Sequence, residues 1–418
     1  MQKIFSSSIL DVIRIRDFRF FLFFRFFLTM ATIMQSVVVG WHIYSLTKDV
    51  LSLGLIGLVE VVPQISIALF AGHFVDLWDR RRIIQFATIL LIIGSVILVI
   101  YSLPVVDGYH KFGTFPVFVT IFITGLVRGI LMPAHTALLG QLVPRDKLTS
   151  AATWSSTNWH IAAVLGPATG GMVYGFTGVV PAYTVVLLFY IISLLLILRV
   201  RPVERFAASR NNEETLFSRI KEGIQFVFHN QVLLGAFSLD MFAVLFGGAV
   251  AVLPVFASDI LYIGPQGLGI LRACPAMGAI MMSALLMAKP PIHKTGRYLF
   301  MGVTGFGVCM IVFALSRNFY LSGIALFLSG VFDNISVVIR ASILQLFTTD
   351  EMKGRVASVN SIFIGSSNEL GAFESGLTAK IMGLVPSVIF GGVMTLLVVV
   401  VAVQKFPLLR KLSLYLST

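Results

Sequence analysis

The chain has few charged residues: Asp, Glu, Lys and Arg make up only 12% of its 418 residues, whereas a soluble domain carries about a quarter. Apolar residues reach 57%, and the mean hydropathy is +0.94. A chain this long and this apolar is stable only with lipid as its solvent. A soluble globular protein is therefore excluded, and the lipid bilayer is an expected partner.

Cysteine is also scarce, because the chain contains only Cys274 and Cys309. Both lie in apolar stretches without a second Cys or a His at ligand spacing, so the sequence predicts neither a disulfide frame nor a metal site. No phosphate-binding loop and no Ser-His-Asp set occurs in the polar segments. We therefore predict a protein that is not an enzyme and that carries no cofactor.

Long apolar runs dominate the sequence instead. A membrane helix needs about 20 mostly apolar residues. Twelve such runs occur, near residues 20–46, 51–75, 83–103, 115–138, 151–176, 179–199, 230–256, 265–287, 298–316, 319–344, 356–382 and 384–404. The sequence thus predicts an all-α membrane protein with twelve transmembrane helices.

Basic residues indicate the orientation of these helices. Lys and Arg outnumber Asp and Glu by 31 to 19, and only Lys48, Lys111 and Arg317 fall on the side opposite to most of the basic residues. This asymmetry follows the positive-inside rule. It predicts that both termini are cytoplasmic, and it gives no indication of a nucleic-acid partner.

The longest polar stretch divides the chain. We expect an N-terminal six-helix bundle at 1–200, a cytoplasmic linker at 201–229 and a C-terminal six-helix bundle at 230–418. Within the linker, apolar residues at helical spacing over 217–224 predict a helix that lies in the headgroup plane. A solvated linker is the alternative.

The two halves contain an internal repeat. Shifted by 205 positions, residues 122–153 align with 327–358 without a gap. Parallel repeats of this kind predict two pseudo-symmetric six-helix bundles with a substrate site between them at mid-membrane. In the same register Arg128 meets Asp333, and these opposite charges are the first candidates for function.

Three motifs resemble one transporter family. GHFVDLWDRRR at 72–82 looks like the loop signature of the major facilitator superfamily, although Leu77 and Asp79 replace its usual Arg and Gly. LGPATGG at 165–171 resembles the motif that marks exporters in this superfamily. FIGSSNELGAFESG at 363–376 is very similar to the branch of enterobactin (siderophore) exporters and macrolide efflux proteins.

The resemblance implies the major facilitator fold and a monomeric, proton-driven exporter of a small organic molecule, siderophore-like or drug-like, in a bacterial cytoplasmic (inner) membrane. It also implies a gating loop of Gly72, Asp76 and Arg80 that latches when the cytoplasmic side closes. In the exporter motif, small residues and a proline allow close packing and bending of the helix. These residues are Gly166, Pro167, Gly170 and Gly171. An importer or facilitator of a metal ion or nutrient is the alternative function for the same fold.

Ionisable side chains inside a membrane cost about 2.5 to 3.5 kcal/mol each at a helix centre. The predicted spans hold five acidic and five basic ones, namely Arg25, Glu60, Arg128, Asp240, Arg272, Asp333, Arg340, Glu369, Glu374 and Lys380. Each of them is therefore either a group that faces a cavity or one half of a structural ion pair.

A carboxylate deep in a span can hold a proton and a cationic partner in turn, which is the chemistry of proton coupling. The proton-coupling candidates are Asp333, Glu369, Asp240, Glu374 and Glu60, and the candidate charge partners are Arg128, Arg340 and Arg25. Structural alternatives remain: Arg340 can neutralise Asp333 permanently from the same helix face, Glu60 can pair with Arg128, and Arg25 can snorkel to the headgroups.

Four polar or aromatic residues are candidates for lining the substrate cavity. They are Trp154, Asn158, Asn334 and Asn368. Trp154 and Asn158 lie four residues apart, on one face of a helix that also carries the exporter motif.

Overall fold

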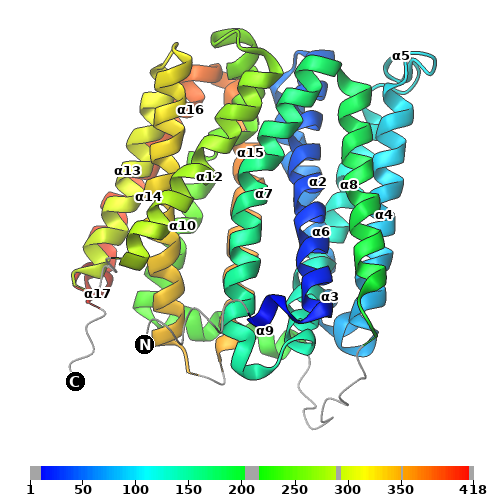
Figure 1. The fold of residues 1–418 in the computed structure, drawn as a ribbon. Coiled ribbons are helices and arrows are strands. Elements are labelled where there is room, and N and C mark those ends of the chain that lie inside the picture. Colours follow the sequence, from blue (N-terminus) through cyan, green and yellow to red (C-terminus); the bar gives the residue numbers. More distant parts are fainter. Residues whose placement is uncertain (1–10, 203–215, 289–292, 350–351, 414–418) are drawn as a thin grey trace. The chain divides into compact units, whose positions relative to one another are not determined.

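The computed structural model describes residues 11–202, 216–288, 293–349 and 352–413, and within them the regular structure is entirely helical (Figure 1). The long helices are α2 (Arg16–Thr47), α3 (Val50–Leu77), α4 (Arg80–Ser102), α6 (Phe115–Leu142), α7 (Leu148–Thr177), α8 (Val179–Arg199), α9 (Leu216–His229), α10 (Gln231–Gly247), α12 (Gly264–Ala288), α13 (Thr295–Leu315), α14 (Phe319–Phe347), α15 (Lys353–Met382) and α16 (Leu384–Lys405). The short elements are α5 (Gly108–Phe112), η1 (Arg145–Lys147), η2 (Ala249–Val252), α11 (Leu253–Val255), η3 (Phe256–Ile260) and α17 (Pro407–Arg410).

Ten helical segments in these ranges are long and apolar enough to cross a membrane. They coincide with ten of the predicted spans to within a few residues. The other two predicted spans correspond to α7 and α15, which have 30 residues each but carry more polar side chains. The length of both helices therefore suits a membrane, and their polarity needs a separate explanation.

Helix α4 shows why lipid suits the outer faces of these helices. Its exposed large apolar side chains recur at spacings of three and four residues, namely Phe86, Ile89, Ile93, Val96 and Ile100. The opposite face is buried and includes Ile84, Leu91 and Leu98. A continuous apolar stripe on the exposed side of a helix is unfavourable in water and favourable against acyl chains.

The chain divides into two compact units. The first comprises residues Met1–Leu46 and Val62–Glu213, and the second comprises Thr47–Val61 and Glu214–Thr418. The first part of α3 therefore packs with the C-terminal helices, although the sequence places it in the N-terminal half. This exchange brings the acidic residue Glu60 into the second unit.

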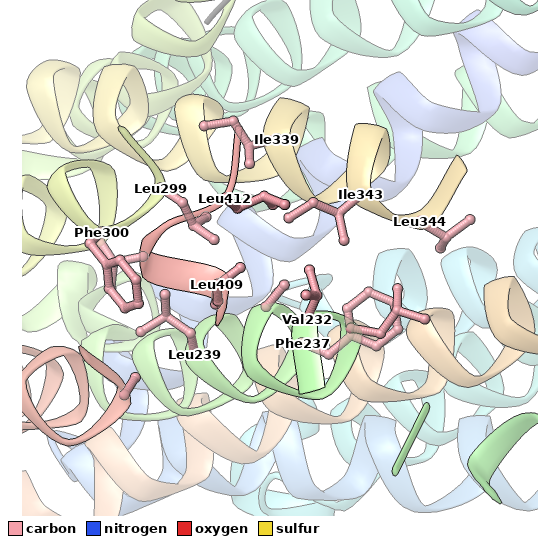
Figure 2. Packing of buried hydrophobic residues seen from close by; sticks show 14 of the residues in the cluster. Val232, Phe237, Leu239, Leu299, Phe300, Ile339, Ile343, Leu344, Leu409 and Leu412 are labelled. Carbon is pink, nitrogen blue, oxygen red and sulfur yellow. The ribbon is translucent and has the colours of Figure 1, made fainter. Parts of the chain in front are cut away.

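The core of the second unit is formed mainly by α10, α13 and α14, with α17 closing one end (Figure 2). Val232, Phe237 and Leu239 come from α10, and Leu299 and Phe300 come from α13. The cluster continues with Ile339, Ile343 and Leu344 of α14 and with Leu409 and Leu412. This packing fixes α10 and α14, which carry the charges described below, against α13.

Helix α10 ends earlier than predicted. The apolar run at 230–256 predicts one span, but α10 stops at Gly247 and continues as the short elements η2, α11 and η3. Adjacent glycines weaken the helix at Gly248, and Pro254 cannot donate the hydrogen bond of a regular helix. At this break the carbonyl oxygen of Gly248 accepts a hydrogen bond of 3.2 Å from the Ser375 hydroxyl of α15.

Helix α9 forms where the sequence predicts an amphipathic helix, and one face of it packs on α15. A Cβ atom at Gly223 would lie 2.9 Å from the carbonyl oxygen of Arg355, so the two backbones are in close contact. Glu222 and Arg355 form an ion pair beside this contact. On the other face, Ile224 and Phe228 are exposed. The predicted location of this helix in the plane of the lipid headgroups stays a prediction.

Candidate functional site

A buried ion pair lies in the core of the second unit. Arg340 Nη1 of α14 is 2.6 Å from Asp240 Oδ2 of α10. The exposed fraction is only 6% for Arg340 and 4% for Asp240. Leu239, Ala243 and Ile339 belong to the apolar cluster next to them. Ionised groups in such surroundings are stable only as a pair, because each alone would lose its hydration without compensation.

Asp333 adds a second carboxylate to this pair. It lies seven residues, or about two helical turns, before Arg340 on α14. Its charge acts on Asp240, and the charge of Arg340 acts on both aspartates. Asp333 is partly exposed, whereas Asp240 is buried. We call these three residues the aspartate–arginine cluster; with both carboxylates ionised, it carries one negative charge in excess.

The cluster relates directly to two predictions. Asp240 and Asp333 were both candidates for proton coupling, and the structure brings them together. The structural alternative for Asp333 was an ion pair with Arg340 on the same helix, but the ion pair of Arg340 is with Asp240 on another helix. The sequence gives no direct signal for this pairing, because it depends on how α10 and α14 pack.

A second group of charges lies on α3, α12 and α15. Both Glu60 and Glu369 act electrostatically on the guanidinium of Arg272. The backbones approach closely here, since a Cβ atom at Gly57 would lie 2.5 Å from the carbonyl oxygen of Glu369. The sequence identified the two glutamates as candidates and counted Arg272 among the ionisable residues without giving it a role. Glu374 lies five residues further along α15 and is partly buried.

The same two helices, α3 and α15, are joined by an ion pair that the sequence did not predict. Lys380 Nζ is 2.8 Å from Asp49 Oδ1, at the connection that precedes α3. The Lys380 ammonium lowers the pKa of Asp49 below its ordinary value. Between this pair and Glu369, a Cβ atom at Gly376 would lie 2.5 Å from Gly54 Cα. Glycine on both helices is what permits this approach.

In the first unit, Arg25 lies near a partly buried histidine, His135. The Arg25 charge acts on His135, whose ring packs edge-on against Phe21 and Phe24 with centroids 6.1 and 5.5 Å away. Arg25 and Arg128 are both partly exposed. Arg128 has interactions of its own, and its pairing with Glu60 stays a prediction.

The cavity candidates have defined contacts. Asn158 Nδ2 donates a hydrogen bond of 3.0 Å to the carbonyl oxygen of Leu22, and Trp154 packs against an apolar cluster that includes Phe18. Asn334 Oδ1 accepts a bond of 3.1 Å from Ser283. These contacts link helices, so they also support the structural alternative for these side chains.

The fourth cavity candidate differs from the other three. Asn368 is exposed, and its Nδ2 donates a hydrogen bond of 2.9 Å to the carbonyl oxygen of Ile364 within its own helix. Its amide therefore has a local partner and remains accessible from outside the helix.

The predicted gating loop is described in part. Gly72 and Asp76 belong to α3, but their contacts lie outside the described part of the chain. Arg80 is the first residue of α4, and Asp79 caps this helix by accepting hydrogen bonds from the backbone of Arg81 and Arg82. The guanidinium of Arg81 also donates to the carbonyl oxygens of Ile197 and Leu198 at the end of α8, at 3.4 and 2.9 Å.

The exporter motif lies on α7 against α2. A Cβ atom at Gly166 would be 3.1 Å from the Ile33 side chain, and one at Gly170 would be 3.1 Å from Met34. Pro167 and Gly171 are buried beside them. The motif residues therefore lie at a close helix–helix contact.

Long apolar helices with a buried ion pair among them are typical of multi-pass membrane proteins, in which such charges mark functional sites. Residues 7–414 match the family described as transmembrane secretion effectors. The chain belongs to this family of the major facilitator superfamily. The expected class of protein is thereby confirmed, and a small-molecule substrate and a lipid environment follow from it.

Two curated relatives resemble the chain over nearly its whole length. The staphyloferrin A transporter of Staphylococcus aureus (strain NCTC 8325 / PS 47) is 23% identical over 415 residues, which cover 96% of this chain and 98% of the relative. Macrolide efflux protein A of Streptococcus pyogenes is 19% identical and covers 93% of this chain and 95% of its own length. These are the siderophore and macrolide branches that the third motif resembles.

Solved structures share the fold. A POT family transporter in complex with 5-aminolevulinic acid superposes with a TM-score of 0.73 at 12% identity, covering 94% of this chain and 96% of that chain. A bacterial homologue of the human lysosomal transporter Spinster gives a TM-score of 0.71 at 13% identity, covering 95% and 97%.

Proposed function

We propose that this protein is a secondary transporter that exports a small organic molecule across the bacterial cytoplasmic membrane in exchange for protons, by alternating access. It crosses the membrane twelve times, works as a monomer and keeps both termini in the cytoplasm. The family supports transport, and the structure supports proton exchange through one observation in particular.

That observation is the composition of the aspartate–arginine cluster. Arg340 neutralises one carboxylate and is already paired with Asp240. Asp333 is the acid left over, and an uncompensated charge in a helix bundle is costly. A proton on Asp333 removes this cost, whereas access to water from either side allows the proton to leave. Proton exchange requires a site that can gain or lose one proton at a small cost in free energy.

The polarity of α7 and α15 also supports this proposal. Each lies at the fifth position of its six-helix half, and each carries polar side chains along a length that suits a membrane. Polar spans are favourable only where they face a water-filled cavity or other helices. We therefore count both as spans, with Trp154, Asn158 and Asn368 on the sides that the substrate contacts.

The cargo follows from the relatives only as a class. One is named for a siderophore and the other for macrolides. We propose an amphiphilic organic molecule of this kind. A comparison of a deletion strain with its parent for secreted iron chelators and for macrolide susceptibility decides between them.

Energised inside-out membrane vesicles test the direction and the coupling together. These vesicles have an acidic interior, which a fluorescent amine reports by quenching. Proton-coupled export predicts that an added siderophore or macrolide accumulates inside and partly restores the fluorescence, because protons leave in exchange. Entry of the substrate only to equal concentrations on both sides, without a change in fluorescence, would indicate a facilitator. Efflux of preloaded substrate in response to the acidic interior would indicate an importer, and either result would contradict the proposal.

A further inference from the structure

A small cavity lies beside the aspartate–arginine cluster. It has a volume of about 10 Å³ and lies between α10, α13 and α14. Its lining consists of Asp240, Ala243, Val244, Val303, Phe306, Asp333 and Ser336. Both aspartates of the cluster thus line one space, which has about the volume that a single water molecule needs.

Ser336 gives the cavity a third polar group. It is 1% exposed, and its hydroxyl has no hydrogen-bond partner among the described residues. It follows Asp333 by three residues and precedes Arg340 by four, so the three side chains share one face of α14. Buried hydroxyl groups nearly always have a partner, and an unpaired one that lines a polar cavity indicates a bound water molecule.

The lining suits water better than a metal cation. Water in a protein interior makes about three hydrogen bonds, which two carboxylates and one hydroxyl supply. Hard cations take about six or more oxygen ligands. Here one oxygen of Asp240 already binds Arg340, and the rest of the lining is apolar. The nearby guanidinium would also repel a cation.

We propose that this cavity holds one water molecule that links Asp240, Asp333 and Ser336 and relays the proton between the two aspartates. The proposal rests on the proposed function, because it specifies how the cluster handles its proton. Ser336 is a positioning residue that orients the water.

The transfer is balanced. The O–H bond of protonated Asp333 breaks as the water oxygen takes the proton, and the water gives one of its own protons to the Asp240 carboxylate. The water is unchanged, Asp333 becomes ionised and Asp240 becomes neutral. The negative charge next to Arg340 has then moved from Asp240 of α10 to Asp333 of α14, the helix that also carries Arg340. Relay of the proton therefore weakens the ion pair that joins α10 to α14.

The relay depends on the charges of the aspartate–arginine cluster and not on those of the surrounding helices. The helices packed against α10 and α14 carry further charged or titratable residues, namely Arg219, Lys221, Glu222 and His229 on α9, Arg272 on α12, Arg297 on α13, Lys353, Arg355, Glu369, Glu374 and Lys380 on α15, Lys405 on α16 and Arg410 on α17. The charges that act on Asp240 come from Arg340 and Asp333, and α13 contributes Val303 and Phe306 to the cavity.

Ser336→Ala tests the relay in the vesicle assay described above. We expect proton exchange to slow at least five-fold, while substrate–substrate exchange without a proton gradient stays within two-fold of the wild type. Proton transfer should become limiting, so the rate in D2O should fall more for this variant than for the wild type. Ser336→Thr keeps the hydroxyl and should restore the rate. Ser329→Ala is the matched control, because Ser329 is a buried serine of the same helix that is bonded to the Leu326 carbonyl.

The other outcomes overturn the relay. Equal loss of both exchange modes in Ser336→Ala would assign the serine to folding, and unchanged proton exchange would remove the water from the path. Transport in the wild type that requires Na⁺ would assign the cavity to a cation. A wild type that exchanges no protons at all would instead refute the proposed function, which keeps the two failures distinguishable.

Discussion

Arg340 of α14 and Asp240 of α10 form an ion pair of 2.6 Å in the interior of the second unit, and Asp333 lies close enough for its charge to act on Asp240. Two carboxylates therefore compete for one guanidinium. This relationship makes the cluster sensitive both to substitution and to the presence of one proton.

The first prediction concerns the stability of the pair. Arg340→Met leaves the buried carboxylate of Asp240 without its partner and should lower the free energy of unfolding by about 3 to 5 kcal/mol. Asp240→Leu should cost less, because Arg340 can then pair with Asp333. The double variant should recover most of the loss. Unfolding in detergent micelles measures this, with the exposed Arg317→Met as control. Simple additivity of the two single effects would contradict the pairing.

The second prediction separates coupling from transport. Asp333→Asn imitates the protonated acid permanently, so the site has one state instead of two. We expect proton-driven accumulation of the substrate to fall to the level of vesicles that lack the transporter, while substrate–substrate exchange persists. Asp107→Asn, on an exposed segment just before α5, should leave both unchanged. Accumulation that stays proton-driven in Asp333→Asn would exclude this residue from coupling.

The fold was largely predictable from the sequence, because a helix that crosses a lipid bilayer must be about 20 residues long and mostly apolar. The predicted run at 179–199 coincides with α8, and most other ends differ by a few residues. The break in α10 was missed, because a run of apolar residues shows no sign of where a helix changes its hydrogen bonds. The packing of residues 47–61 with the C-terminal helices was also unpredictable, since it depends on contacts between residues far apart in the chain.

The candidate site was predictable only as a set of side chains. The cost of burying charge identified Asp240, Asp333 and Arg340, but not which of them pair. Ser336 was overlooked even though helical spacing places it between Asp333 and Arg340 on one face. Whether a helix face meets another helix or a cavity is decided by tertiary packing, which a single sequence does not display.

The third prediction addresses the glycine contact of α3 and α15. A Cβ atom at Gly376 would lie 2.5 and 2.7 Å from backbone atoms of Gly54, so Gly376→Ala should cost about 1 to 3 kcal/mol of stability. Gly354→Ala in the same helix meets nothing within 4 Å, and it should be neutral or stabilising by up to about 1 kcal/mol. Equal effects of the two substitutions on unfolding in micelles would show that the contact is not close.

The fourth prediction concerns the hydrogen bonds at the end of α8. Arg81→Ala leaves the carbonyl oxygens of Ile197 and Leu198 without their donor and should cost about 1 to 2 kcal/mol. The exposed Arg82→Ala, whose side chain is 84% exposed, should change stability by less than about 0.5 kcal/mol. Thermal unfolding of the two variants side by side measures the difference. A larger effect at Arg82 would contradict the assignment.

The fifth prediction follows from the pair of Asp49 and Lys380. Because Lys380 lowers the pKa of Asp49 in the folded protein, the pair stabilises the fold above the unfolded pKa of about 4. The contribution is lost as the pH falls through the lower folded pKa. Both side chains are partly exposed, at 32% and 57%, so the effect should stay below about 1 kcal/mol.

Unfolding of the wild type and of Asp49→Asn between pH 3 and pH 7 measures this difference. We expect the wild type to be more stable at neutral pH and the two curves to converge at the acidic end, where Asp49 gains its proton. Lys380→Gln should give the same neutral-pH loss, and the double variant should lose no more than either single one. A gap between wild type and Asp49→Asn that is constant across the whole range would mean that the Asp49 charge does not bind Lys380.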